Sequence, residues 1–117
     1  MIRIRSKDQY LAFNANNDDG STVDTKEDAT ILRNKPGYFL INTYSSLFGE
    51  DTLKAEKVEE AYILATQNGY LMKVNDYGVP KLTDDKEKAL LLSYKQYTIL
   101  KNLLENQGFL VEKEQID

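Results

Sequence analysis

The chain repeats itself at an interval of sixty residues, and this repetition restricts the fold more than any other feature. Residues 24–32 read DTKEDATIL, and residues 84–92 read DDKEKALLL. The same offset aligns Tyr10 with Tyr70 and holds without a gap over residues 2–42. A self-similar interval of this length is typical of duplicated supersecondary units. We therefore expect a tandem duplication, the alternative being a chance recurrence of the same strand-turn-helix pattern.

Each unit begins with a pattern typical of a β-hairpin. In IRIR, Ile2 and Ile4 alternate with two arginines, which predicts a strand with one buried face. The matching segment AYILAT is more apolar, so we expect a central strand that is buried on both faces. Asn68-Gly69 is the strongest short hairpin signal in the chain, and the NDYG at residues 75–78 predicts a second turn.

The segment that opens the repeat predicts a short helical turn. Asp24 and Asp84 each precede a Glu by three residues, which is the spacing of a capping box. Ala29 and Ala89 then allow close packing, and TIL or LLL follows as a short buried strand. We interpret these charges as caps and solvated turns rather than as catalytic acids.

A helix and a closing strand complete each unit. In the second unit Ser93 and Gln96 form a capping box, Gly108 suits the helix end, and FLVEKE at residues 109–114 is the last strand. An apolar stripe contains Tyr97, Leu100 and Leu104.

In the first unit, residues 35–49 have strand-like composition. Pro36 near the start of a helix and Gly49 just past its end nevertheless favour a helix. Beyond this helix, Leu53 is best matched to Leu110.

These expectations give an α+β fold in which two tandem repeats, each a hairpin, a short strand, a helix and a closing strand, pack as one pseudo-symmetric domain. The domain covers residues 1–117 and is built from repeat unit 1–60 and repeat unit 61–117. A unit of this size is marginally stable alone, so we expect the two units to be inseparable.

Composition excludes several classes of chemistry. The chain is 41% hydrophobic and 29% charged, which is typical of a globular protein. It has no Cys and no His, so thiolate nucleophiles, imidazole bases and the commonest zinc ligands are missing. A net charge of −4 is too mild to indicate nucleic-acid binding. No apolar run is long enough to span a bilayer, and the first residues lack a signal-peptide pattern, so we expect a cytoplasmic protein.

No motif predicts a catalytic, cofactor or metal site. Asn14, Asn16 and Asp18 alternate like calcium-loop ligands, but positions six and twelve of such a loop would hold Asp19 and Thr25 instead of Gly and Glu. Nucleotide-binding glycine loops and the G-x-S-x-G elbow are missing. We expect no enzyme activity, no cofactor and no metal.

Two surface features remain as candidate partner-binding residues. All three arginines, Arg3, Arg5 and Arg33, lie in the first unit. Arg3 and Arg5 share one strand face and could grip a carboxylate or phosphate, or they could protect an edge strand from aggregation. Tyr77 lies in a predicted turn, where an exposed aromatic side chain can anchor an interface.

The second unit also resembles a known group of proteins. GYLMKVNDYGVPKLTDDKEKALLLSYKQYTILKNLLENQGFLVE at residues 69–112 is similar to small uncharacterised accessory proteins of Gram-positive phages and mobile elements. The resemblance covers residues 62–115 well and residues 2–57 loosely. It brings no assigned activity and implies an accessory protein that modulates a host protein.

These observations favour a non-enzymatic protein-binding module, an inhibitor or modulator of a host or defence protein. Two alternatives stay open. One is a nucleic-acid-associated protein, which binds through the arginines or mimics nucleic acid with its acidic loops. The other is a structural protein that assembles with itself through edge strands.

Overall fold

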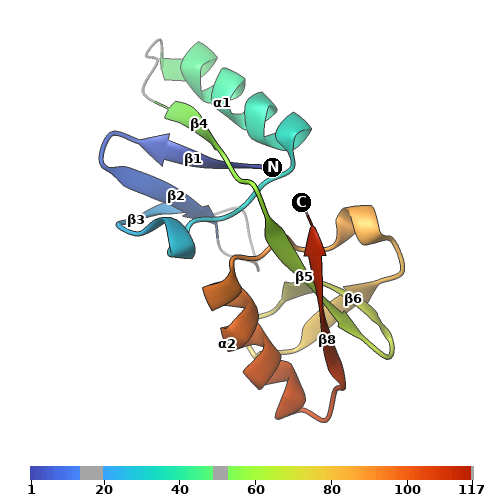
Figure 1. Ribbon diagram of the computed structural model, residues 1–117. Helices are drawn as coiled ribbons and strands as arrows, with labels where there is room; N and C mark the ends of the chain where they lie inside the picture. The colour runs from blue at the N-terminus through green and yellow to red at the C-terminus, as the bar shows by residue number, and fades with distance from the viewer. Residues whose placement is uncertain (14–19, 49–52, 117) are drawn as a thin grey trace.

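The structure is a computed structural model that describes residues 1–13, 20–48 and 53–116. It is a mixed α+β fold with two four-stranded antiparallel sheets and two α-helices, as Figure 1 shows. The calcium-loop pattern at Asn14, Asn16 and Asp18, and the helix-ending Gly49, lie outside the described residues.

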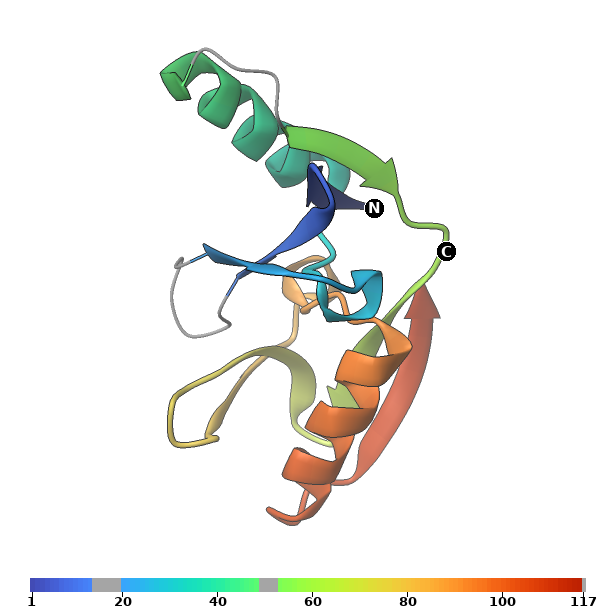
Figure 2. The ribbon, with the colours of Figure 1, turned by 90° about the vertical axis from the view of Figure 1, so that its left-hand side faces the viewer.

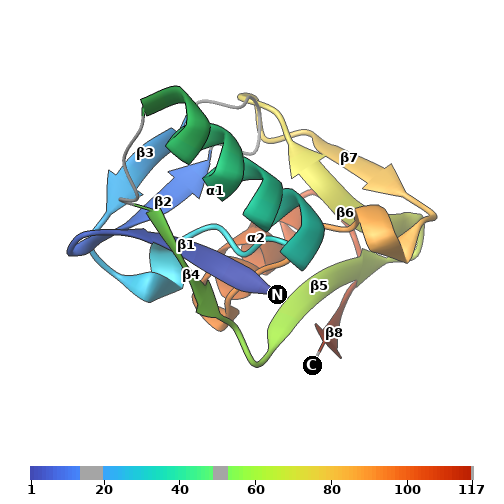
Figure 3. The same cartoon turned by 90° about the horizontal axis from the view of Figure 1, so that it is seen from above.

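The first sheet has the strand order β3-β2-β1-β4. Its strands are β1 (Ile2–Ser6), β2 (Gln9–Phe13), β3 (Gly20–Val23) and β4 (Leu53–Lys57). Helix α1 (Asn34–Phe48) packs on one face of this sheet, against β1 and β4 (Figure 3). The segment of the first half with strand-like composition therefore forms a helix, as predicted.

The second sheet has the strand order β7-β6-β5-β8. Its strands are β5 (Ala61–Thr66), β6 (Gly69–Val74), β7 (Pro80–Thr83) and β8 (Val111–Ile116). Helix α2 (Tyr94–Glu105) packs on β5 and β8. Figures 1 and 2 show α1 with its sheet above, and α2 with its sheet below.

The burial of the two central strands follows the sequence pattern. Ile2 and Ile4 of β1 are buried together against α1, with Ile41 of the helix in the same cluster. In β5 the neighbours Ile63 and Leu64 are both fully buried, so this strand is covered on both faces, as predicted. Because β1 lies between β2 and β4, the interpretation of its arginines as guards of an edge strand is wrong.

Each half contains a strand that the sequence patterns missed. After the first hairpin of each half, the chain forms a third strand that pairs with the hairpin. This strand is β3, beside β2, in the first half and β7, beside β6, in the second. The predicted strands at residues 30–32 and 90–92 are reduced to one bridge each, Ile2 to Leu32 and Tyr62 to Leu92.

The predicted capping boxes at Asp24 and Asp84 are also wrong. The short turns are 3₁₀ helices, η1 (Lys26–Asp28) and η2 (Lys86–Lys88), and each begins one residue later than predicted. Asp85, not Asp84, caps η2 by accepting a hydrogen bond from the Glu87 N–H. Thr25 precedes η1 without a side-chain cap.

The ends of α2 are as the sequence predicts. Ser93 and Gln96 form the reciprocal capping box. At the other end the Phe109 N–H donates to the Leu104 carbonyl and the Gly108 N–H to the Glu105 carbonyl, with Gly108 at φ +91°. These two bonds make a Schellman motif, which satisfies helix carbonyls that would otherwise lack donors.

The closing strands differ slightly from prediction. β8 begins at Val111, two residues beyond the predicted start. In the first sheet Ser6 pairs with Leu53, and in the second Thr66 pairs with Val111, so the counterpart of Leu53 is Val111 and not Leu110.

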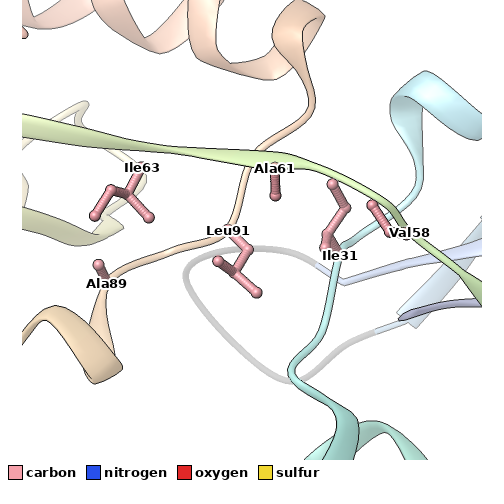
Figure 4. Close-up of a cluster of buried hydrophobic side chains, with 6 residues drawn as sticks. All are labelled: Ile31, Val58, Ala61, Ile63, Ala89 and Leu91. Atoms are coloured by element: carbon pink, nitrogen blue, oxygen red, sulfur yellow. The ribbon is translucent and has the colours of Figure 1, made fainter. Parts of the chain in front are cut away.

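An apolar cluster joins the two halves, and Figure 4 shows its side chains pointing toward one another. Ala61 and Ile63 of β5 meet Ala89 and Leu91 from the segment after η2. Ile31 from the first half completes the cluster, together with Val58 from the connection between the halves. Both predicted small residues, Ala29 and Ala89, are buried.

In the part of the chain that the structure describes, neither helix has the length and apolar character needed to cross a membrane.

Candidate functional site

Arg33 is engaged inside the fold rather than offered to a partner. Its Nη1 donates to the Ala89 carbonyl at 2.9 Å, and its Nη2 donates to the Lys86 carbonyl at 3.0 Å. Its Nε lies 3.7 Å from a Glu87 carboxylate oxygen. The guanidinium therefore satisfies one carbonyl in η2, that of Lys86, and the carbonyl of Ala89 directly after it, across the contact between the halves.

Arg3 is also engaged. Its Nε lies 3.4 Å from Glu56 Oε1, across the β1–β4 ladder, and its Nη1 donates to the Lys26 carbonyl at 3.4 Å. The side chain is only 16% exposed. Tyr10 donates its hydroxyl to the other Glu56 oxygen at 3.2 Å, so this carboxylate has two partners.

Arg5 differs from the other two arginines. It is exposed, and its Nε donates to the Lys7 carbonyl at 2.9 Å. Across the described residues, no carboxylate forms an ion pair with Arg5. The structure thus separates three residues that the sequence placed in one class, since within the described part of the chain Arg5 alone keeps both terminal nitrogens free.

Tyr77 lies at the tip of the turn between β6 and β7, as predicted, and its side chain is 92% exposed. The turn is held by the Asn75 side chain, whose Oδ1 accepts hydrogen bonds from the N–H groups of Tyr77 and Val79, each at 2.9 Å. The Asn75 and Val79 backbones bond at 3.0 Å, and Gly78 has φ +79°. A tyrosine on a turn this well fixed loses little conformational entropy when it binds.

The turn rests on helix α2, which extends the apolar surface. Gln107 donates its side-chain amide to the Gly78 carbonyl at 2.7 Å. A Cβ on Gly78 would lie 3.6 Å from Leu103 Cδ1, so the half-buried leucine underlies the turn. Ile99 is 59% exposed and lies four residues before Leu103, on the same side of the helix. We call Tyr77, Val79, Ile99 and Leu103 the Tyr77 surface.

The sequence patterns missed an aromatic group on the other side of α2. The Tyr62 and Tyr94 rings pack edge to face with centroids 5.8 Å apart. The Lys113 ammonium lies 5.1 Å from the Tyr62 centroid and 5.2 Å from the Tyr94 centroid. Because the chain's own lysine already occupies these rings, the group is a cation–π contact within the fold.

An open groove of about 290 Å³ lies between the first residue and the end of β8. It is lined by Met1, Arg33, Asn34, Lys86, Glu87, Leu91 and Ile116. Its two cationic side chains already have partners, since Arg33 binds η2 and Lys86 pairs with Glu114. The groove therefore has little free charge for a ligand.

The described residues contain no group of three acidic side chains placed to hold a metal ion. Asp84 and Asp85, the paired carboxylates of the second half, are exposed at the start of η2, and Asp85 acts as its cap. Comparison of the chain with protein-family models, with curated proteins and with solved structures found no match.

Proposed function

We propose that this protein is a non-enzymatic module that binds another protein through the Tyr77 surface. The observation that supports this most is the combination of 92% exposure at Tyr77 with a turn held by backbone and side-chain hydrogen bonds. Exposed tyrosines on rigid turns are efficient interface anchors, because they bring a large contact area at low entropic cost. Val79 and Ile99, at 55% and 59% exposure, widen the contact.

The proposal also includes the kind of partner. On the resemblance to phage and mobile-element accessory proteins, the partner is a protein of the bacterial host or its defence systems, which the module inhibits or modulates in the cytoplasm. An inhibitor needs a stable surface and no catalytic group, and the Tyr77 surface meets that requirement.

We also propose that the scaffold arose by tandem duplication of repeat units 1–60 and 61–117, which pack around a pseudo-two-fold axis as one domain. Both halves have the same order of strands, 3₁₀ helix, helix and closing strand. The bridge from Ile2 to Leu32 recurs sixty residues later as the bridge from Tyr62 to Leu92. In this view the shared pattern maintains the fold, and the surfaces that differ between the halves carry the binding.

The nucleic-acid alternative loses support because two of its three arginines are engaged. Arg3 and Arg33 are bonded to groups distant in the chain, so among the described residues Arg5 is the one arginine with both Nη groups free, whereas phosphate binding requires several contacts. Self-assembly through edge strands is the weaker alternative for β4 and β8, because at least half of the residues in each strand are charged, and charges on an edge disfavour pairing with a second copy.

The test is affinity capture from a native lysate of the source cell with the wild-type chain and with Tyr77→Ser. Tyr38→Ser is the matched control, since Tyr38 is an exposed tyrosine on α1, at 49% exposure, outside the Tyr77 surface. We expect one protein to remain bound at high salt with the wild type and with Tyr38→Ser, and to be lost with Tyr77→Ser.

Retention of the same protein by Tyr77→Ser, at unchanged melting temperature, would refute the Tyr77 surface as the binding site. Loss of all bound material at high salt, with nucleic acid in the eluate, would favour the nucleic-acid alternative. Recovery of the chain's own oligomers alone would favour self-assembly.

A further inference from the structure

A second surface, independent of the Tyr77 surface, lies on the opposite half of the molecule. Arg5 of β1 is paired across the ladder with Lys54 of β4. Residues that face each other on an antiparallel ladder project on the same side of the sheet, so these two cations are neighbours. Both are exposed, as is Lys7 in the turn after β1. We call Arg5, Lys7 and Lys54 the basic cluster.

Within residues 1–13, 20–48 and 53–116, no ion pair neutralises the charges of the basic cluster. The carboxylate of Glu56, two residues from Lys54 on the same side of β4, already has Arg3 and Tyr10 as partners. In the described ranges, Arg5, Lys7 and Lys54 have no carboxylate partner. Like charges directly opposite on a ladder destabilise it, so the arrangement weakens the sheet unless an anion joins it.

The turn after β1 also fixes the orientation of the Arg5 side chain. Lys7 has φ +56°, a left-handed conformation that is uncommon for a residue with a side chain. The turn presents the Lys7 carbonyl to Arg5 Nε at 2.9 Å. This bond fixes the plane of the guanidinium while both Nη groups stay free in the described structure, and two parallel N–H donors match the two oxygens of a carboxylate.

The position of β4 indicates the shape of the partner. β4 is an edge strand that pairs with β1 on one side only. An extended segment can therefore lie along its outer edge, as in recognition by strand addition. Nucleic acid is a poorer match, because its phosphates call for cations spread along a strand, whereas these three gather at one end of one sheet.

We infer that the basic cluster binds an extended acidic segment of a protein partner, with a carboxylate held between Arg5 and Lys54. The inference does not rest on the Tyr77 surface, which lies in the other half and is apolar.

The test is titration of the full chain with a hexaglutamate peptide at low salt, with the NMR chemical shifts of the backbone amides as the readout. We expect the shifts to concentrate on β1, β4 and the turn at Lys7.

The double variant Arg5→Gln/Lys54→Gln should weaken binding at least about tenfold, because it removes charge-assisted hydrogen bonds. The matched control is Lys73→Gln/Lys81→Gln, which removes another pair of cationic side chains opposed on a ladder and changes the net charge equally. This control should keep the affinity within about twofold.

A second variant adds a readout, the melting temperature, that does not depend on the peptide. Lys54→Glu places a carboxylate opposite Arg5, so we expect it to raise the melting temperature while abolishing hexaglutamate binding. Tyr77→Ser should bind hexaglutamate like the wild type, which keeps a failure of this inference distinct from a failure of the Tyr77 surface.

Three results would overturn the inference. One is equal weakening by both double variants, which would mean general attraction between charges. Another is a lower melting temperature for Lys54→Glu with unchanged peptide binding. The third is binding of a single-stranded oligonucleotide through the same residues in place of hexaglutamate.

Discussion

The guanidinium of Arg33, in the first half of the chain, donates a 2.9 Å hydrogen bond to the carbonyl of Ala89 in the second half. A reciprocal bond joins the Gln96 side chain to the Ala29 carbonyl at 3.0 Å. Ala29 and Ala89 are sixty residues apart, so matching carbonyls receive a donor from opposite halves. Different side chains thus bond to equivalent carbonyls, and Ala89 also belongs to the apolar cluster that joins the halves.

Arg33→Ala should lower the free energy of unfolding by about 1–3 kcal/mol, mainly because the part-buried Ala89 carbonyl loses its charged donor, whereas water can replace the donor at the exposed Lys86 carbonyl. Urea denaturation measures the change. Lys35→Ala is the control, because Lys35 is exposed on the first turn of α1. Equal stabilities of the two variants would show that water replaces the guanidinium without cost.

Ile63→Ala should cost about 2–5 kcal/mol, since it opens a cavity in the cluster shared by the halves. Ile63 is fully buried. Unfolding of this variant should remain a single transition that coincides in far-ultraviolet and near-ultraviolet circular dichroism. Ile99→Ala, at a site that is 59% exposed, should change stability by less than about 0.5 kcal/mol. Two separate transitions would refute the view that the halves form one cooperative unit.

Ser93→Ala should be more costly than an ordinary loss of a helix cap, for which about 1 kcal/mol is typical. The Ser93 hydroxyl accepts from the Gln96 N–H at 3.2 Å and also donates to the Glu27 carbonyl of the other half at 2.7 Å. Thermal unfolding of Ser93→Ala beside Thr98→Ala, an exposed change within α2, provides the comparison. A melting temperature unchanged by Ser93→Ala would contradict both roles.

The pair of Asp28 and Lys95 should make stability depend on pH in the acid range. Lys95 Nζ lies 2.9 Å from Asp28 Oδ1. This hydrogen bond and a second one from Thr25 hold the pKa of Asp28 below its ordinary value of 3.8. The pair's contribution is therefore fully present above that value and is lost as pH falls through the lower pKa of the folded state.

Asp28→Asn should accordingly be less stable than the wild type at neutral pH and approach it in acid. Urea denaturation across the acid range measures the difference in the free energy of unfolding. A difference that does not vary with pH would exclude the ion pair as its cause.

Local patterns in the sequence predicted the elements whose stability depends on neighbouring residues. The capping box of Ser93 and Gln96 and the helix end at Gly108 are in place. The predicted hairpin also forms, but its connecting residues are Gln67 and Asn68, and Gly69 is the first residue of β6 and pairs with Thr66. Each depends on backbone groups within about one turn of chain, so residue type and spacing are sufficient signals. The apolar composition of β5 likewise indicated that both of its faces are buried.

The same local rules failed where two neighbouring residues could both take the same structural role. Asp84 and Asp85 both suit a cap, and the structure uses Asp85. The strands β3 and β7 were missed because each is four residues long and lacks a clear alternation of apolar residues. They form because the preceding strand offers an unpaired edge, which is a property of the assembled sheet.

The sequence by itself determined the repeated order of turns and helices, the buried faces of the central strands and the exposed turn that carries Tyr77. Only the tertiary structure decided which arginine is free. Arg3 and Arg5 are two residues apart on one strand face, yet Arg3 lies opposite Glu56 and Arg5 lies opposite Lys54. The register between β1 and β4 sets these pairings, because strands distant in sequence meet only when the chain packs. A guanidinium becomes internal or available according to the charge that this register places beside it.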